Sequence, residues 1–281
     1  MVRNPTALAG RRVLLTGAAR GIGAAAARRL HERGARVALA GLEAERLGEV
    51  AAACGGAPWY ECDVADRGQV DAAVAACAGE LGGLDVVIAN AGVAAQLPLA
   101  GGDPAIFERT VRVNLFGAYY TLRAAAPHIA HPGGYALAVA SLAAALHAPL
   151  LGAYSASKAA VEALADTLRI ELHATGARVG VAYFAKIATD MTERGFGTEA
   201  AGRLPELPFA RVAPVEAAVG AIERGVAHRA RRVVAPGWVA AVLPVRTVAQ
   251  RLVDLGSRRG LPETLAIARS EAAPLTTRQP E

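Results

Sequence analysis

The chain has 281 residues, 53% of them hydrophobic and 20% charged, so it can bury a sizeable core and is not a disordered protein. Its net charge of +5 arises from arginines that alternate with acidic residues and form no long run, which disfavours nucleic acid as a partner. The sequence shows no secretory signal, no apolar stretch of the ~20 residues that a membrane-spanning helix needs, and no metal-ligand spacing among its three cysteines. We therefore expect a cytoplasmic protein with no integral membrane span and no metal site.

Short apolar runs alternate with segments of helical period along most of the chain. The apolar runs predict strands at residues 12–16, 36–40, 57–61, 84–89, 135–140, 178–183 and 232–235. The segments between them predict helices at residues 21–33, 43–54, 66–80, 104–126, 154–174 and 214–228. This alternation predicts an α/β fold with a parallel sheet that is covered by helices on both faces.

The carboxyl-terminal part of the chain has a different pattern. Residues 187–210 are glycine-rich and aperiodic, as in an insertion that closes over a site as a lid. We expect one domain over residues 10–245, followed at 246–281 by a helical extension that ends in a flexible tail. The stretch that begins at Trp238 is short and broken by Pro244, which favours a contact between subunits over a peripheral membrane contact.

A glycine-rich loop joins the first predicted strand to the first predicted helix, in the stretch "LLTGAARGIGAA". Gly17 would permit a tight turn, Gly21 would let the backbone approach a phosphate, and Gly23 would let the helix pack close to the strand. A pyrophosphate would then rest on the N–H groups at the start of the helix. The alternative is a tight turn that binds nothing, but the strand before the loop and the helix after it favour a dinucleotide site.

The end of the second predicted strand bears on the choice of dinucleotide. NAD-binding folds often carry an acid there, and Gly41 occupies that position. Arg20, inside the glycine loop, offers a guanidinium to a 2′-phosphate. Both features favour NADP(H) over NAD(H), although Glu43 could turn inward and Arg20 could instead be a solvated loop charge. Further along, Asp63 could accept a hydrogen bond from adenine.

Two more groups of residues follow later strands. The stretch Asn90-Ala91-Gly92 is small enough to leave room for a ribose. Tyr154 and Lys158 are four residues apart, on one face of a predicted helix, and the chain holds only one other lysine, Lys186. A cation beside a phenol lowers the pKa of the phenol, so that the tyrosine can act as an acid and base.

Two polar residues precede this pair. Ser141 follows a strand and could polarise a substrate carbonyl beside Tyr154. Asn114 lies within a predicted helix, where asparagine is a poor helix former, and could open the helix locally and hold a water that links Lys158 to solvent. The alternative for Tyr154 and Lys158 is a surface pair, which the scarcity of lysine in this chain makes the weaker interpretation.

Together these residues resemble the short-chain dehydrogenase/reductase family, over residues 10 to 235. The resemblance implies a single-domain, Rossmann-like, doubly wound parallel sheet of seven strands, usually assembled as a homodimer or homotetramer. It also implies that Asn114, Ser141, Tyr154 and Lys158 form a catalytic tetrad. The cofactor contacts that it implies are Gly17, Arg20, Gly21, Ile22, Gly23, Asp63, Val64, Asn90, Ala91, Gly92, Tyr154, Lys158, Ile187 and Thr189. Phe184-Ala185 departs from the Pro-Gly that the family usually has there, which alters the floor of the pocket.

The sequence leaves the substrate open. Candidate pocket residues are mostly apolar, namely Leu142, Ala143, His147, Leu151 and Phe184. They favour a fairly hydrophobic small-molecule alcohol or ketone as substrate, such as a lipid, a terpenoid, a steroid or a polyketide. One alternative is a reductase of 3-oxoacyl thioesters in fatty-acid or polyketide synthesis, since an acidic carrier would suit a basic surface. The alternative of another class is a sensor or scaffold that binds NADP(H) without turnover.

Overall fold

A seven-stranded parallel sheet forms the centre of the computed structural model, which describes residues 7–195, 198–203, 211–271 and 275–276. The strand order is β3-β2-β1-β4-β5-β6-β7, so the order reverses between β1 and β4. The strands are β1 (Arg12–Thr16), β2 (Arg36–Gly41), β3 (Trp59–Glu61), β4 (Val86–Ala89), β5 (Tyr135–Val139), β6 (Arg178–Phe184) and β7 (Arg232–Ala235). This confirms the predicted Rossmann-like fold, in which ligands bind at the carboxyl ends of the strands, where the order reverses.

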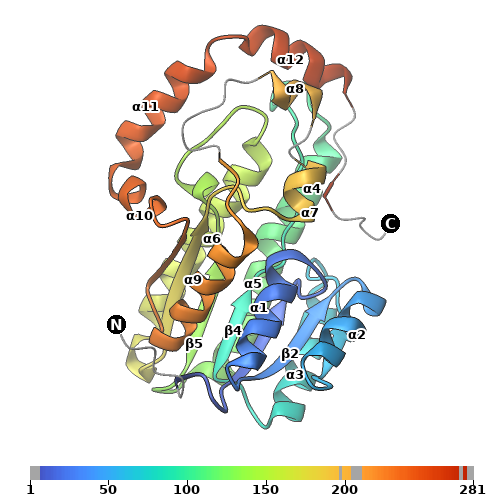
Figure 1. Cartoon of the computed structure of the whole chain (residues 1–281), viewed down its shortest axis with the longest axis vertical. Coiled ribbons are helices and arrows are strands. Elements are labelled where there is room, and N and C mark those ends of the chain that lie inside the picture. Colours follow the sequence, from blue (N-terminus) through green and yellow to red (C-terminus); the bar gives the residue numbers. More distant parts are fainter. Residues whose placement is uncertain (1–6, 196–197, 204–210, 272–274, 277–281) are drawn as a thin grey trace.

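Helices cover both faces of the sheet (Figure 1). One face packs against α1 (Gly21–Glu32), α2 (Ala44–Ala53) and α9 (Val215–His228), and the other packs against α3 (Arg67–Leu81), α5 (Gly117–Ile129) and α6 (Gly152–Glu171). The helix α4 (Pro104–Val111) precedes α5 and packs against α6. Because both faces are covered, the central strands are apolar on both sides, as their near-continuous hydrophobic runs predicted.

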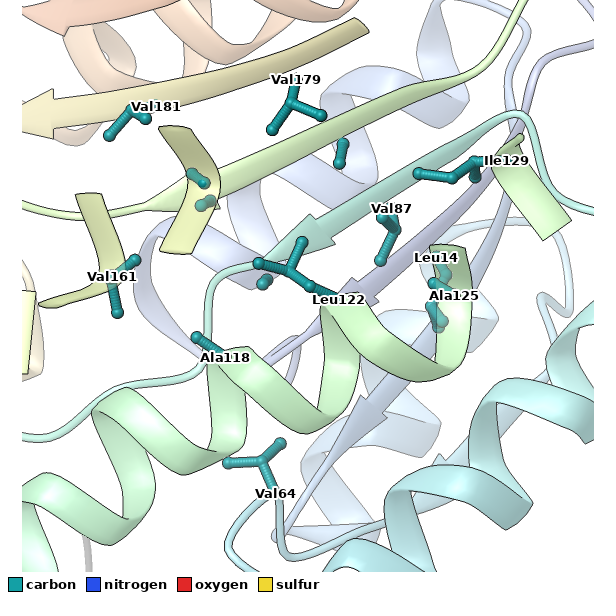
Figure 2. Close-up of a cluster of buried hydrophobic side chains, with 14 of the residues drawn as sticks. Leu14, Val64, Val87, Ala118, Leu122, Ala125, Ile129, Val161, Val179 and Val181 are labelled. Atoms are coloured by element: carbon teal, nitrogen blue, oxygen red, sulfur yellow. The ribbon is translucent and has the colours of Figure 1, made fainter. Parts of the chain in front are cut away.

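The core beneath α5 shows how alternate residues of a strand serve the two faces. Figure 2 shows Leu122 and Ala125 of α5 directed toward Leu14 of β1 and Val87 of β4. The neighbouring strand residues point to the opposite face, where Ile88 belongs to the cluster around α1 and α9. Each of these leucine, isoleucine and valine side chains contributes roughly 1.5–3 kcal/mol when it is fully buried.

Local signals in the sequence explain most element boundaries. Asp103 caps α4, since its side chain accepts a hydrogen bond from Ala105 N at 2.8 Å, and Pro104 takes the first helical position. The strand β3 begins at Trp59 rather than at residue 57, because Pro58 has no N–H to donate to a neighbouring strand. The helix predicted at 104–126 is interrupted by a π-helical turn, Arg112–Phe116, and continues to Ile129.

The extension after β7 folds as helices, as predicted. After α10 (Val239–Val242), α11 (Arg246–Ser257) and α12 (Leu261–Ser270) arch over the carboxyl edge of the sheet (Figure 1). Arg246 pairs with Glu162 of α6 at 3.0 Å, and the side chain of Gln250 bonds to both backbone polar groups of His147. In the described ranges, no helix has both the length and the apolar character that crossing a bilayer requires.

The aperiodic insertion and the tail lie beside this extension. The insertion contains two short helices, α7 (Asp190–Gly195) and α8 (Glu199–Gly202), while residues 196–197 and 204–210 lie outside the described residues. Of the tail that we expected to be flexible, the structure describes Leu275 and Thr276. Thr276 is 2% exposed and pairs with Ala94, whose N–H and carbonyl it bonds, both at 3.1 Å. This part of the tail therefore packs against the domain.

Candidate active site

A cavity of about 680 Å³ opens at the carboxyl edge of the sheet, between the glycine loop and the carboxyl-terminal helices. It brings together residues that are far apart in the sequence. Every residue predicted to contact the cofactor lines it, as do Ser141, Tyr154 and Lys158. The exception among the predicted site residues is Asn114, which is fully buried behind the lining.

The glycine loop has the close packing that a dinucleotide site requires. Gly17 has φ +65°, and a Cβ at this position would lie 2.7 Å from Ala91 Cα. A Cβ at Gly23 would overlap the carbonyl oxygen of Gly17, so the helix approaches the loop only because this residue has no side chain. The first turn of α1 carries no acidic residue and no side-chain cap. Its N–H groups therefore suit an anion such as a pyrophosphate.

Asn90 fixes the loop to the end of β4. Its Nδ2 donates to the carbonyl oxygens of Thr16 and Gly17, at 3.0 and 3.2 Å. The hydroxyl of Thr16 accepts in return from the backbone N–H groups of Asn90 and Ala91. These bonds satisfy the backbone at the point where the strand order reverses, and they leave the small residues Ala91 and Gly92 on the floor of the cavity.

Arg20, which we expected to be available to a phosphate, belongs to a local network of ion pairs. The guanidinium of Arg20 pairs with Glu43 and also with Asp190, at 3.2 Å from the latter. Arg46 reaches the same two carboxylates, at 3.5 and 4.0 Å. Glu43 has therefore turned inward, the alternative that the sequence left open. Gly41 leaves space beside the loop, since a Cβ there would lie 3.6 Å from Ala18 N.

Asp63 follows β3, the strand next to β2, and lines the cavity. It is 8% exposed, and its carboxylate accepts from Ala65 N at 2.9 Å and from Arg109 Nη2 at 2.7 Å. These two bonds hold the carboxylate in one orientation. Val64 lies beside it in the cavity lining.

Tyr154 and Lys158 both face the interior of the molecule from the first turns of α6. Tyr154 is 8% exposed and Lys158 is 3% exposed, which excludes a surface pair. The Nζ atom of Lys158 donates to Val139 O at 2.8 Å and lies 5.8 Å from the centre of the Tyr154 ring. Ser141 follows β5, where its hydroxyl accepts from Ala143 N at 3.1 Å and donates to Phe184 O at 3.3 Å.

The electrostatics of this cluster differ from the expectation that lysine lowers the pKa of the tyrosine. Burial raises the pKa of Tyr154, and the hydrogen bond with Ser141 is the contribution that lowers it. Burial also lowers the pKa of Lys158 to about 8. Desolvation disfavours the charged form of each group, so burial shifts the pKa of the phenol up and the pKa of the ammonium down, away from each other.

Asn114 supports the cluster from behind. It sits in the π-helical turn, so the predicted local opening of the helix is confirmed. Its side chain bonds both backbone polar groups of Val93, at 2.8 and 2.9 Å, and donates to Ser157 Oγ at 3.0 Å. Ser157 in turn donates to Tyr154 O at 2.8 Å. The water that Asn114 was expected to hold stays a prediction.

The segment after β6 forms the cavity floor. Phe184 is 4% exposed and lines the cavity together with Ala185, Ile187 and Thr189. Lys186 also reaches the cavity rim and is exposed, which agrees with the solvent-facing position that we favoured. His147, a candidate pocket residue, is exposed and is not among the lining residues. Leu142, Ala143 and Leu151 line the cavity as predicted.

Sequence reasoning missed several lining residues. Gln96 and Thr198 face one another across the cavity wall, with Thr198 Oγ1 donating to Gln96 Oε1 at 2.8 Å. Val253, Ser257 and Thr276 reach the cavity from the extension. A polar Gln96 within the apolar run "VAAQLPL" was a usable signal, whereas nothing local places residues 253–276 at this site.

Comparisons with known proteins give the same picture. The family model for short chain dehydrogenases matches residues 11–200. An uncharacterized oxidoreductase of Mycobacterium tuberculosis is 33% identical over 247 residues, which cover 84% of this chain and 70% of the relative. A D-threitol dehydrogenase of Mycolicibacterium smegmatis is 34% identical over 222 residues, 76% of this chain and 85% of the relative. The crystal structure of levodione reductase has the same fold, with a TM-score of 0.76 and 24% identity, over 83% of this chain and 98% of that one.

Proposed function

The chain belongs to the short-chain dehydrogenase family, and from that premise we propose that it transfers a hydride between NADP(H) and a small hydrophobic alcohol or ketone, with Tyr154 as the acid and base. An oxidoreductase that acts on CH–OH or carbonyl groups follows from the family itself. The finer proposal rests on one observation. Tyr154, Ser141 and Lys158 are buried together and line the same cavity as the glycine loop.

The chain offers a complete set of contacts for the cofactor. We assign the pyrophosphate to the glycine loop at Gly17–Gly23, and the adenine edge to Asp63 and Val64. The nicotinamide ribose falls to Lys158 and to the stretch at Asn90, and the carboxamide to Ile187 and Thr189. The cavity lining, which includes all of these residues, supports the assignment. When bound, the nicotinamide supplies or accepts the hydride.

Tyr154 handles the proton that accompanies the hydride. In the reductive direction its O–H bond breaks, the proton passes to the carbonyl oxygen of the substrate, and the electron pair stays on the phenolate. Ser141 donates to the same carbonyl oxygen and polarises it. The Lys158 ammonium stabilises the phenolate, and its pKa of about 8 keeps most of it charged at neutral pH. Because burial raises the pKa of Tyr154, the phenol is ready as an acid for reduction.

The preference for NADP(H) rests on the end of β2. Gly41 provides no carboxylate there, and the guanidinium of Arg20 lines the cavity, while Arg46 pairs with the same Glu43 carboxylate. A 2′-phosphate would replace the Glu43 carboxylate as the partner of Arg20. Titration with NADPH and with NADH tests this preference, and a tenfold or greater preference for NADH would overturn it.

Turnover tests the mechanism. The purified chain is assayed with NADPH against a panel of ketones that includes an acetoacetyl thioester, and with NADP⁺ against alcohols. The Tyr154→Phe variant is expected to lose roughly 10²–10⁴-fold in kcat while it still binds NADPH, since it lacks only the proton-transferring group. The control is Tyr60→Phe, which removes a hydroxyl that pairs with Glu80 on the protein surface.

Two outcomes would count against this mechanism. NADPH binding without turnover of any substrate would favour the sensor or scaffold, and full activity in Tyr154→Phe would exclude the proposed acid and base.

Assembly as a homodimer or homotetramer is also part of the proposal. Large apolar side chains are exposed on the π-helical turn, α5, α6 and α11, among them Phe116, Tyr119, Ile170, Leu252 and Leu255. Such side chains are typical of subunit contacts. Light scattering coupled to gel filtration, with and without detergent, tests this point: a monomer without detergent would contradict it.

A further inference from the structure

The cavity has a second polar feature apart from the reacting cluster. Residues 93–97, which we call the wall segment, run between two other parts of the chain. Leu97 N donates to Leu150 O at 2.9 Å, two residues before α6, the helix that carries Tyr154, begins at Gly152. At the other end, Ala94 pairs with Thr276 of the tail. The wall segment therefore lies between the reacting tyrosine's helix and the carboxyl-terminal extension.

Gln96 is the polar side chain of this segment, and one end of its amide is committed. It is 8% exposed and lines the cavity. Its Oε1 accepts from Thr198 Oγ1 at 2.8 Å. The Thr198 hydroxyl already accepts from Ala201 N at 3.2 Å, so its own proton is available for Oε1. This pairing sets the orientation of the amide, with Oε1 toward Thr198 and Nε2 left for the cavity.

The other end of the amide, Nε2, points to no partner among the described residues. Within the residues that the structure describes, no hydrogen bond to Gln96 Nε2 is formed, although this group carries two N–H donors. Nε2 is not among the fully buried unpartnered atoms of the described residues, so this donor is accessible from the cavity that Gln96 lines. A ligand in the cavity can supply the missing acceptor.

We propose that Gln96 is a specificity-determining residue, which donates a hydrogen bond from Nε2 to a second oxygen of the substrate, on a carbon remote from the reacting one. The inference rests on the proposed function and names its substrate class: hydroxyketones and diketones in the reductive direction, and diols in the oxidative direction. A monofunctional ketone of the same skeleton would leave the amide without a partner and would be a poorer substrate.

The second oxygen is neutral rather than anionic. The lining residues contributed by α8, by α11 and by the tail are uncharged: Thr198, Ala201, Gly202, Val253, Ser257 and Thr276. An amide can donate to a carboxylate, but a desolvated carboxylate needs a countercharge as well. Among the charged lining residues, Arg20, Asp63, Glu43 and Asp190 are engaged in ion pairs at the cofactor end, and Lys186 is exposed at the rim, on the segment after β6. A neutral hydroxyl or carbonyl oxygen can accept a hydrogen bond from Nε2 without this cost.

A matched substrate series tests the inference. We would compare cyclohexanone with its 2-, 3- and 4-hydroxy derivatives, using NADPH and the full chain. For wild type, kcat/KM for the best hydroxyketone is expected to exceed that for cyclohexanone by roughly 10- to 100-fold, the range of one buried hydrogen bond. In Gln96→Met, which has a similar volume but no N–H donor, this ratio is expected to fall to about one, mainly through KM.

A control variant separates the amide from a general effect of the substitution. Gln250→Met makes the same change on α11, at a residue that bonds His147 outside the cavity lining. It is expected to keep the wild-type ratio. A ratio that is unchanged in Gln96→Met, or that falls equally in Gln250→Met, would overturn the inference. Thermal unfolding of both variants shows whether they are folded.

A binding measurement keeps this inference separate from the proposed function. Calorimetry measures the affinity of the NADP⁺-loaded chain for cyclohexanol and for 1,2-, 1,3- and 1,4-cyclohexanediol. Tighter binding of one diol, lost in Gln96→Met, would support the inference even if no substrate were turned over. Equal affinity for cyclohexanol and every diol in wild type would overturn it, whether or not the chain reduces ketones.

Discussion

Replacing Lys158 by methionine is expected to stabilise the fold while it removes activity. Lys158 is 3% exposed, and burial lowers its pKa from 10.5 to about 8. At pH 7 Lys158 is mostly protonated in both states, but it binds its proton far more tightly in the unfolded chain than in the folded one. With ~1.4 kcal/mol for each pKa unit, holding the ammonium in the interior costs about 3 kcal/mol of stability.

Methionine removes this cost together with one hydrogen bond. The Lys158 ammonium donates to Val139 O at 2.8 Å, and its loss is expected to cost about 1 kcal/mol. Methionine has an unbranched side chain of similar length and fills irregular apolar space well. The net expectation at pH 7 is therefore a free energy of unfolding about 2 kcal/mol greater for Lys158→Met than for wild type.

The pH dependence gives the sharper test. Because the pKa of Lys158 is lower in the folded chain, the unfolded chain binds more protons between pH 8 and 10.5, and wild-type stability rises with pH in that window. The advantage of Lys158→Met should shrink by roughly 2–3 kcal/mol from pH 7 to pH 10. Burial raises the thiol pKa of Cys62 and Cys77 from 9.0 to about 12, which lowers stability above pH 9, but equally in both proteins. The difference between them isolates the lysine.

Urea denaturation without cofactor, at pH 7 and at pH 10, measures this difference. Lys186→Met is the control, since it makes the same substitution at the exposed lysine and should show no change in this window. If Lys158→Met were less stable than wild type at pH 7, and by the same amount at pH 10, the reasoning from a buried ammonium would be refuted. Steady-state assays with NADPH should show that the more stable variant has lost turnover.

Three other substitutions probe the cofactor end and its support. Glu43→Gln removes the carboxylate that pairs with Arg20. Given ~1 kcal/mol for a half-buried ion pair, the ratio of kcat/KM for NADPH to kcat/KM for NADH should increase about fivefold. An unchanged ratio in steady-state kinetics would contradict this. Asn114→Leu leaves the buried N–H and carbonyl groups of Val93 without partners and should lower the free energy of unfolding by about 2–4 kcal/mol, as measured by urea denaturation. Equal stability of the variant and the wild type would contradict the supporting role of Asn114. Gly23→Ala places a Cβ into the glycine loop and should weaken NADPH binding at least ~10-fold by fluorescence titration. Gly79→Ala, on α3 with open space around its Cα, should bind NADPH as wild type does.

The sheet and the glycine loop could be predicted because their signals are local. A buried parallel strand needs a short apolar run, and a close approach of helix and loop needs glycine at fixed positions. One short stretch of consecutive residues predicts both the strand at 12–16 and the close approach of helix and loop at Gly17 and Gly23. The unusual position of asparagine in a helix was also a local signal, and it marked the π-helical turn at Asn114.

The electrostatics of the site could not be predicted in the same way. The spacing of Tyr154 and Lys158 shows that they share a helix face, but not how far that face is removed from water. Burial decides the direction of both pKa shifts, and it is set by packing of α6 against β5 and β6. The second partner of Arg20 was equally hidden, since Asp190 lies 170 residues away in the sequence, whereas the sequence had left open an inward turn of Glu43, the first partner.

The substrate end of the cavity is the least local part of the protein, and the carboxyl-terminal extension closes it. Glu271 accepts from the N–H groups of Glu199 and Ala200, at 2.7 and 3.1 Å, and so holds the helix that Thr198 caps. Thr276 holds the other side through Ala94. Thr198, which bonds Gln96, and Ala94, two residues before Gln96 in the chain, are therefore both held by the carboxyl-terminal extension, which lies outside the sheet. The glycine loop at the edge of the sheet shapes one end of the cavity, whereas Glu271 and Thr276 hold α8 and the wall segment in place at the other end.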